Sequence, residues 1–260
     1  MKDRWKKNTV KLAAGALAFG LGAAAPVTAL AGTAAAEPSQ TAVSTVPAAC
    51  GWQKIADSWY CLGPDGMPCT GEQTLGDSIC RFSEDGVFEE ARWIPGTGGG
   101  PYTVGCFEAE EQALFDRLSE EKAEEYFDLH PDREEDYGGD MRTSYDRYAG
   151  FFVEDALNRA AAARLLGAME NGYADGKVFG QGELSDYLAS ISYRSRASCL
   201  ELYLRSCQDG EEAYEKAAEW LDRKREKKDD RKYTLEYYRY LGMASAEKEG
   251  KRSFLVILLR

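Results

Sequence analysis

Residues 51–70, GWQKIADSWYCLGPDGMPCT, and residues 71–90, GEQTLGDSICRFSEDGVFEE, are two copies of one unit. Aligned without a gap, the copies share Gly, Gln, Asp and Ser at four places and an Asp-Gly pair near the end. A fixed period indicates one supersecondary unit that has been copied. Each copy holds two short strand-like runs and closes on the Asp-Gly pair, which tight turns select because these residues tolerate positive φ. We therefore expect each unit to be a small β-hairpin.

The sequence changes character after the repeats. Residues 94–101, IPGTGGGP, have the composition of a linker. Beyond them, apolar residues recur at three- and four-residue spacing, which predicts helices at 106–129, 153–170 and 211–227. Strand-like runs at 237–244 and 253–259 follow, joined by a Lys-Glu-Gly-Lys turn. The last run contains FLVILL, which is typical of a strand inside a sheet covered on both faces. This order predicts an α+β fold.

The amino terminus has the organisation of a secretory signal peptide. Lys and Arg residues precede an Ala-, Leu- and Gly-rich stretch at 12–25, and small-residue cleavage patterns follow it up to residue 36. This stretch is short of the roughly 20 strongly apolar residues that a retained membrane anchor requires. We therefore expect a secreted protein, extracellular or associated with the cell wall, without membrane contact after cleavage.

The charge balance bears on the class of partner. The chain has 32 Lys and Arg against 44 Asp and Glu, a net charge of −12. Loss of residues 1–36 would leave 27 basic and 43 acidic residues, a net charge of −16. Nucleic acids and anionic lipids bind through Lys and Arg that neutralise phosphate. The sequence therefore argues against polyanion binding as a function of the mature chain.

All seven cysteines lie beyond the predicted signal peptide, which fits an exported chain in which disulfides persist. Four of them crowd the repeats, where a module with little core benefits from covalent staples. In the second half, Cys199 and Cys207 are the candidate disulfide pair, and Cys106 is free or paired across domains. The only histidine is His130, so we expect no zinc site, no other cofactor and no histidine-based catalysis.

The run GWQKI at 51–55, followed by SWY at 58–60 and PDG at 64–66, resembles the choline-binding type of cell wall-binding repeat found in secreted Gram-positive proteins. This resemblance implies an aromatic cage for the choline of wall teichoic acid. Trp52, Trp59 and Tyr60 stand at the matching positions. The second copy has Glu, Ile and Cys there, so we expect at most one incomplete site for teichoic acid choline or another wall glycan. The alternative is that these aromatic residues only form the core of the hairpin pair.

Four blocks, taken in order across residues 106–260, resemble the CAP superfamily in its bacterial SCP-like extracellular form. They are VEDALNRAAAARLLGAMENG at 153–172, ISYR at 191–194, EEAYEKAAEWL at 211–221 and LEYYRYLGMASAEKEGKRSFLVILL at 235–259. The resemblance implies an α-β-α sandwich. Its metal-binding cleft uses two His and two acidic residues, but Ala174 and Glu226 stand where the histidines belong. We expect no metal there. An acidic position of the family falls at either Ser198 or Glu201, and Glu201 and Glu226 are the candidate acidic remnants of the cleft.

The predicted organisation is a signal peptide at 1–36, cell wall-binding hairpin repeats at 48–93, a Gly/Pro linker at 94–104 and a CAP-like domain at 105–260. The predicted function is a non-enzymatic cell-surface protein whose CAP-like domain binds a protein, a glycan or a small apolar ligand. Tyrosines between residues 233 and 240 are a candidate sugar-stacking surface, or else core and rim positions. The alternative function is a wall-remodelling hydrolase, which requires Glu201 and Glu226 to lie within about 10 Å of each other across a cleft.

Overall fold

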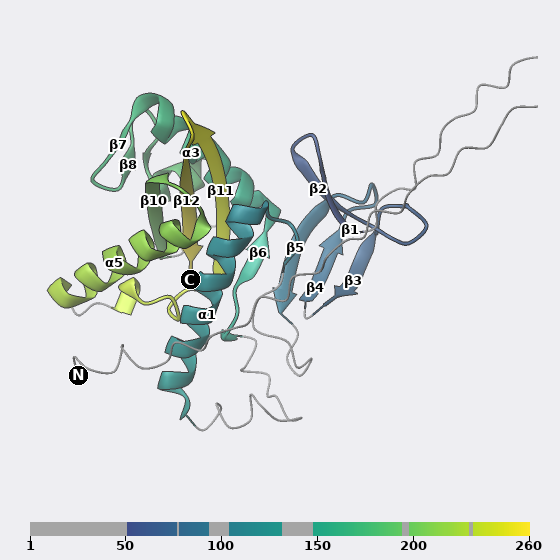
Figure 1. Ribbon diagram of the computed structural model, residues 1–260, viewed down its shortest axis with the longest axis horizontal. Coiled ribbons are helices and arrows are strands. Elements are labelled where there is room, and N and C mark those ends of the chain that lie inside the picture. Colours follow the sequence, from purple (N-terminus) through teal and green to yellow (C-terminus); the bar gives the residue numbers. More distant parts are fainter. Residues whose placement is uncertain (1–50, 77, 94–103, 132–147, 194–197, 229–230) are drawn as a thin grey trace, which may run out of the picture. The chain divides into compact units, whose positions relative to one another are not determined.

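The computed structural model describes residues 51–76, 78–93, 104–131, 148–193, 198–228 and 231–260 (Figure 1). The predicted signal peptide and nearly all of the predicted linker lie outside these residues. The described part of the chain combines α-helices with β-strands, so the predicted α+β class is confirmed. None of its helices is both long enough and apolar enough to span a membrane.

Both copies of the repeat fold as β-hairpins in the same frame. The paired strands are β1 (Gly51–Ile55) with β2 (Ser58–Leu62), and β3 (Gly71–Leu75) with β4 (Ser78–Phe82). The tip of the first hairpin is Ala56-Asp57, where Ala56 has a φ of 54°. The Asp-Gly pairs instead lie in the loops that leave each hairpin, where Gly66 and Gly86 have φ of 75° and 80°. The hairpins are therefore as predicted, but the Asp-Gly pairs are not at their tips.

The second hairpin belongs to the same sheet as the C-terminal half of the chain. Seven strands are hydrogen-bonded in the order β10-β12-β11-β6-β5-β4-β3. Strand β5 (Phe88–Trp93) makes the link, because it pairs antiparallel with both β4 and β6 (Phe152–Glu154). Strand β6 then pairs parallel with β11 (Tyr240–Lys248). The predicted boundary at 94–104 therefore does not divide the protein into two separate sheets.

Helices cover both faces of the C-terminal part of the sheet (Figure 1). One face carries α1 (Ala109–Leu129) and α5 (Gly210–Lys228), and the other carries α3 (Asp155–Asn171) and α4 (Leu184–Ser190). A small three-stranded sheet lies between α3 and α4 in sequence and consists of β7 (Tyr173–Ala174), β8 (Lys177–Val178) and β9 (Gly182–Glu183). The three predicted helices are confirmed, with ends shifted by up to three residues.

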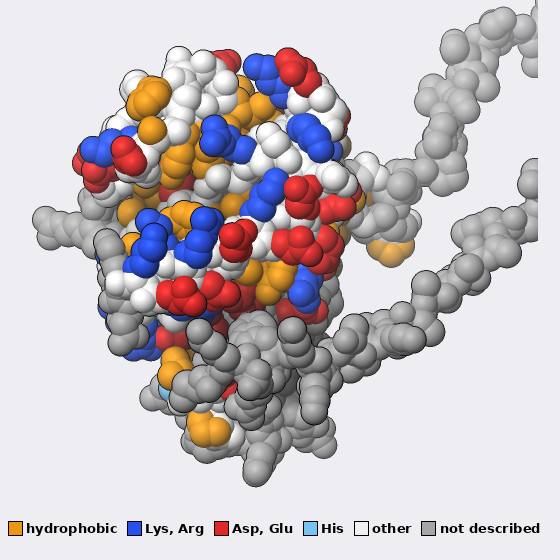
Figure 2. Space-filling model, turned by 60° about the vertical axis from the view of Figure 1, so that its left-hand side comes forward, with side chains coloured by type: hydrophobic (Ala, Val, Ile, Leu, Met, Phe, Trp, Pro, Cys, Tyr) orange, Lys and Arg blue, Asp and Glu red, His pale blue; other side chains and the backbone are white. Residues whose placement is uncertain are grey.

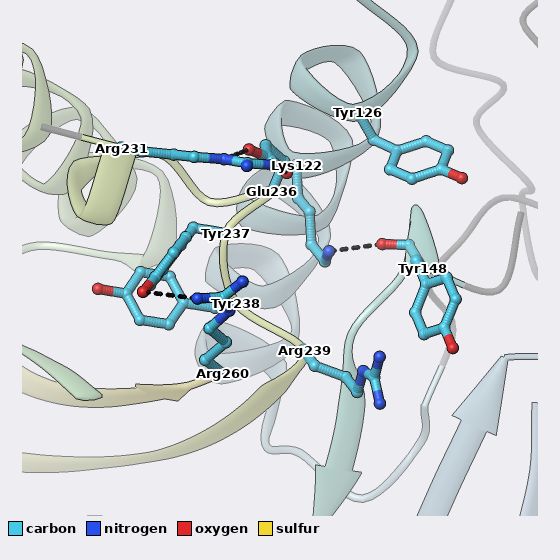
Figure 3. Close-up of a pocket in the computed structure, with 9 residues that line it drawn as sticks. All are labelled: Lys122, Tyr126, Tyr148, Arg231, Glu236, Tyr237, Tyr238, Arg239 and Arg260. Carbon is cyan, nitrogen blue, oxygen red and sulfur yellow. Dashed lines mark hydrogen bonds and ion pairs between the residues drawn. The ribbon is translucent and has the colours of Figure 1, made fainter. Parts of the chain in front are cut away.

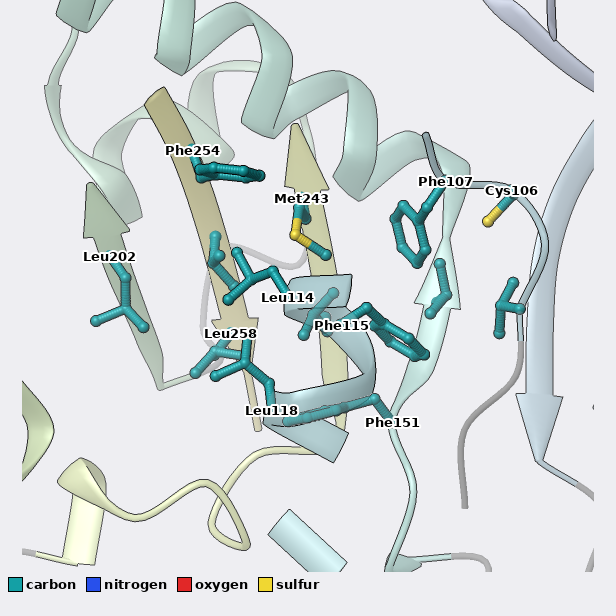
Figure 4. Close-up of a cluster of buried hydrophobic side chains, with 14 of the residues drawn as sticks. Cys106, Phe107, Leu114, Phe115, Leu118, Phe151, Leu202, Met243, Phe254 and Leu258 are labelled. Atoms are coloured by element: carbon teal, nitrogen blue, oxygen red, sulfur yellow. The ribbon is translucent and has the colours of Figure 1, made fainter. Parts of the chain in front are cut away.

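Strand β12 (Lys251–Leu259) lies between β10 (Cys199–Cys207) and β11. Its side chains contribute to two hydrophobic clusters, one on each face of the sheet. Alternate side chains of a strand point to opposite faces. On one face, Phe254, Val256 and Leu258 pack with α1 and α5 (Figure 4). On the other, Leu255, Ile257 and Leu259 pack with α3 and α4. All six are buried, so the predicted position of FLVILL inside a covered sheet is confirmed.

The first hairpin forms a separate two-stranded sheet and joins the core through Trp52. The ring centroid of Trp52 lies 5.6 Å from that of Phe82 and 5.3 Å from that of Phe88. A Cβ atom at Gly105 would lie 2.0 Å from the Trp52 ring, so only glycine fits there. Phe82 and Phe88 share their core cluster with Leu114 and Phe115 of α1 and its neighbours. The repeats and the C-terminal half are therefore joined by side-chain packing as well as by the sheet.

The predicted disulfide between Cys199 and Cys207 is wrong. These residues are the first and last of β10, and both thiols are free. A strand rises about 3.3 Å per residue, which places their Cα atoms roughly 25 Å apart. A disulfide needs Cα atoms within about 7 Å. Residues 199–207 form a strand and not the short loop that this disulfide would close.

Candidate functional site

A pocket of about 340 Å³ lies beside the C-terminal half of α1 (Figure 3). Lys122 and Tyr126 reach it from α1, Tyr148 from the chain before β6, and Arg260 from the residue after β12. The other side chains come from η3 (Arg231–Tyr233) and the segment that follows it; they are Arg231, Glu236, Tyr237, Tyr238 and Arg239. Four of the nine lining residues are cationic and one is anionic. The volume is in the range of small-molecule sites.

The segment at 234–239 brings these residues together because it turns instead of continuing as a strand. The sequence predicts a strand from residue 237, but β11 begins at Tyr240. The N–H of Tyr238 donates to the Leu235 carbonyl at 3.0 Å. The Glu125 carboxylate of α1 accepts the backbone N–H groups of Leu235 and Glu236 at 2.5 and 2.9 Å. Helix α1 thus holds the turn in place.

Lys122 is withdrawn from water, with 1% of the residue exposed. Its Nζ donates to the Tyr148 carbonyl at 2.6 Å and lies 5.1 Å from the centroid of the Phe151 ring. Burial lowers the pKa of Lys122 to about 7, although the carboxylates of Glu236 and Glu125 act in the opposite direction. Near neutral pH, therefore, both protonation states of this amine are populated.

The arginines of the pocket lie against tyrosine rings. The guanidinium carbon of Arg239 is 4.4 Å from the centroid of the Tyr148 ring, and that of Arg260 is 4.6 Å from the Tyr237 ring. Arg260 Nη1 also donates to the Tyr237 hydroxyl at 3.2 Å. Hydrogen bonding to Ser198 and to Arg260 lowers the pKa of Tyr237.

Glu236, the carboxylate of the pocket, is already paired. Its Oε1 and Oε2 accept from Nε and Nη2 of Arg231 at 2.6 and 3.0 Å. The guanidinium groups of Arg239 and Arg260 instead have tyrosine rings beside them. Guanidinium forks match the geometry of carboxylate and phosphate groups. The pocket therefore offers two arginine forks, a buried amine and flat aromatic faces to one small ligand.

Cations predominate in the lining of the pocket although the chain as a whole is acidic. On the face drawn in Figure 2, Lys and Arg side chains stand next to Asp and Glu side chains. The whole chain carries a net charge of −12, so its average field repels anions. A small anion would therefore be attracted by the local arrangement of the pocket and not by the net charge of the protein.

The structure does not assemble the predicted choline cage. Trp52 is paired across the hairpin with Cys61, and Trp59 with Lys54. Because neighbouring residues of a strand point to opposite faces, Trp52 and Trp59 share one face and Tyr60 lies on the other. Trp52 packs on the core, and the Lys54 Nζ lies 5.9 Å from the centroid of the Trp59 ring. An ammonium group of the protein itself thus contacts one of the predicted cage rings.

The structure does not bring Glu201 and Glu226 together across a cleft, as the alternative hydrolase function requires. Glu201 is on β10, 8% exposed, and its Oε1 and Oε2 accept from Nε and Nη2 of Arg164 at 2.6 and 2.7 Å. Arg164 belongs to α3, on one face of the sheet. Glu226 is exposed on α5, which covers the other face. With the sheet between them, these two carboxylates cannot act on the same bond.

Comparison with known proteins identifies no relative. No protein-family model, no curated protein and no solved structure matches the chain. The resemblances to choline-binding repeats and to the CAP superfamily therefore stay predictions. Within the described residues, no group of three or more His, Cys, Asp or Glu is arranged to hold a metal ion.

Sequence reasoning found only part of the pocket. The tyrosine-rich run at 233–240 was a visible signal, and Tyr237 and Tyr238 of that run line the pocket. Lys122 had no such signal, because a lysine in a charged amphipathic helix is normally solvated. The positions of Arg239 and Arg260 depend on the turn before β11 and on the end of β12, which local periodicity does not predict.

Proposed function

We propose that this chain is an exported ligand-binding protein, and that its pocket beside α1 binds a small organic anion with a planar ring and a carboxylate or phosphate group. The observation that carries the proposal is the placement of Arg239 and Arg260 over tyrosine rings beside buried Lys122. Export rests on the basic and Ala-rich residues at 1–36. An anion suits this lining better than the apolar ligand expected from the sequence.

The chemistry of the lining supports each part of the ligand. An arginine fork binds a carboxylate or phosphate through two parallel hydrogen bonds, which are stronger than neutral ones. Tyrosine rings offer flat faces on which an aromatic ring stacks. The amine of Lys122 adds a positive charge when it is protonated, and its burial strengthens its attraction for an anion.

Calorimetric titration of the full chain tests this function. Benzoate and phenyl phosphate serve as anionic probes, and benzyl alcohol is the neutral control of similar shape. We expect both anions to bind and the alcohol to bind much more weakly. Arg239→Gln and Arg260→Gln should each weaken anion binding roughly ten- to hundredfold, because each removes a charge-assisted hydrogen bond.

Arg223→Gln is the matched control, since Arg223 is exposed on α5 and is not among the lining residues of the pocket. We expect it to bind the anions as the parent chain does. Equal binding of benzyl alcohol and benzoate would overturn the proposed selectivity for anions. Equal weakening by Arg223→Gln and the pocket variants would show that net charge, and not the pocket, attracts the probes.

A further inference from the structure

Two cysteines stand opposite each other where the first repeat closes. Cys61 is in β2, and the Asp-Gly turn brings the chain back to Cys69. The N–H of Cys69 donates to the Cys61 carbonyl at 2.8 Å, and the N–H of Gly63 donates to the Met67 carbonyl at 2.9 Å. Between these two bonds, residues 62 and 68 form an antiparallel bridge. This register makes Cys61 and Cys69 direct partners across the turn.

The register brings the backbone of Cys61 and Cys69 to a separation that a disulfide can bridge. Opposite residues of an antiparallel pair have Cα atoms about 4.5–5.5 Å apart, and their side chains share one face. Disulfides form at Cα separations of about 4.4–6.8 Å. Both thiols are free in the structure. Cys61 is buried, whereas Cys69 is half-buried and accessible to a reagent.

In the second repeat, the side chains at the two equivalent positions interact. Twenty residues further along the chain, the same positions are occupied by Arg81 and Glu89. Arg81 Nη1 and Glu89 Oε2 form an ion pair at 2.5 Å. One copy thus closes its exit loop with an ion pair. The other copy has two thiols at the equivalent place.

We propose that Cys61 and Cys69 form a disulfide that closes the exit loop of the first hairpin. The oxidant is a low-molecular-weight disulfide or the disulfide of a thiol oxidoreductase. The more exposed Cys69 thiolate attacks one sulfur of the oxidant, which releases one thiol and leaves a mixed disulfide. Cys61 then loses its proton and attacks the Cys69 sulfur, releasing the second thiol. The chain loses two hydrogen atoms, and the oxidant is reduced to two thiols.

The bond would fix a loop that contacts the second repeat. Pro68 and Cys69 pack against the exit turn of the second repeat, where a Cβ at Gly86 would lie 2.5 Å from Pro68 Cβ and 3.3 Å from the Cys69 carbonyl oxygen. The loop therefore carries one of the contacts between the first hairpin and the main sheet. A disulfide at its base would hold that contact when the hairpin loosens.

Peptide mapping of the full chain tests the disulfide. The protein is incubated with oxidised glutathione, alkylated, and cleaved after Lys54, Met67 and Glu72, which separates Cys61 from Cys69 and both from the other cysteines. We expect fragment 68–72 to remain joined to fragment 55–67 until a reductant is added. The joined species should be lighter by two hydrogen atoms than the sum of the two fragments.

Cysteine variants distinguish the Cys61–Cys69 disulfide from other pairings of the cysteines. Cys69→Ser should abolish the joined species, and Cys199→Ser, a control on β10 far along the chain, should leave it unchanged. Protease cleavage in the loop at 63–67 should be slower in the oxidised parent than in the reduced parent or in Cys69→Ser. Alkylation of both Cys61 and Cys69 after oxidation, or linkage of either one to a different cysteine, would overturn the proposal. Circular dichroism verifies that each variant is folded.

Discussion

The ammonium group of Lys122 lies where water does not reach, and this burial opposes its charge. Its polar contact among the described residues is the Tyr148 carbonyl at 2.6 Å. Glu236 and Glu125 favour the charged form, whereas Arg239 disfavours it together with burial. The result is a pKa of about 7 against an ordinary value of 10.5. A group with such a shift makes the stability of the protein depend on pH.

The Lys122→Met variant should reveal this dependence. Between pH 7 and 10.5 the unfolded chain binds more protons at residue 122 than the folded chain, so the stability of the parent rises with pH in this window. Methionine carries no proton, so any stability advantage of the variant shrinks as the pH rises. The change is on the order of several kcal/mol, at about 1.4 kcal/mol per pKa unit. Urea unfolding of both proteins at pH 7.5, 8.5 and 9.5 measures it.

The range from pH 7.5 to 9.5 keeps most of the titration of Glu125 out of the comparison between the parent and Lys122→Met. Burial raises the pKa of Glu125 to about 7, so this carboxylate titrates mainly below the range used. Lys227→Met is the matched control, because Lys227 is exposed on α5. Its stability difference from the parent should not vary with pH. A constant difference for Lys122→Met across the range would show that residue 122 keeps an ordinary pKa.

At the scale of elements, the β1–β2 hairpin is attached to the protein through one of its faces. Trp52 lies on that face against Phe82 and Phe88, and Tyr60 lies on the opposite face. Trp52→Ala should therefore lower the free energy of unfolding by roughly 2–4 kcal/mol, because a large half-buried ring leaves the core. Tyr60→Ala should cost about 1 kcal/mol or less. Chemical unfolding curves of the two variants give both values.

Choline distinguishes this packing role from the cage predicted by resemblance. If the aromatic residues serve only to pack the β1–β2 hairpin against the core, choline should not raise the unfolding midpoint of the parent or of either variant. Stabilisation of the parent by millimolar choline, lost in Trp52→Ala and in Tyr60→Ala, would restore the predicted cage. The position of Lys54 over the Trp59 ring argues that choline does not stabilise the protein, because an ammonium group of the protein itself already lies over that ring.

At the scale of the whole molecule, the second repeat shares one sheet with the C-terminal half, and both repeats share one core cluster with it. Strand β5 pairs with β6 through Glu90 with Glu154 and Ala91 with Val153. A chain that begins at Gly105 would lose β5 and leave β6 without its partner on that side. It would also lose Phe82 and Phe88 from the core. We therefore expect this fragment to be much less stable than the full chain.

Thermal unfolding measures this effect. The full chain should unfold in one cooperative transition, because the described repeats have no core of their own and share a hydrophobic cluster with the C-terminal half. The fragment from Gly105 should melt at a lower temperature and bind a hydrophobic dye. Two well-separated transitions in the full chain, the second coinciding with that of the fragment, would instead support the two independent modules predicted from the sequence.

Local periodicity determined a large part of the secondary structure. The twenty-residue repeat predicted both hairpins, the 3.6-residue pattern predicted α1, α3 and α5, and the run FLVILL predicted a strand covered on both faces. These features follow from the sequence because hydrogen bonds and side-chain directions within a helix or a hairpin repeat at short, fixed intervals. No distant residue is needed to establish them.

Only the tertiary structure decided which strands pair and which helices pack on each face of the sheet. The pairing of β5 with β6 merged two predicted modules into one sheet, and the sheet between α3 and α5 separated Glu201 from Glu226. The pocket depends on Glu125 holding the backbone of Leu235, 110 residues away. Burial of Lys122 likewise follows from what packs around α1 and not from its own pattern. Such contacts are set by the packing of whole layers, and a local pattern carries no record of its distant partner.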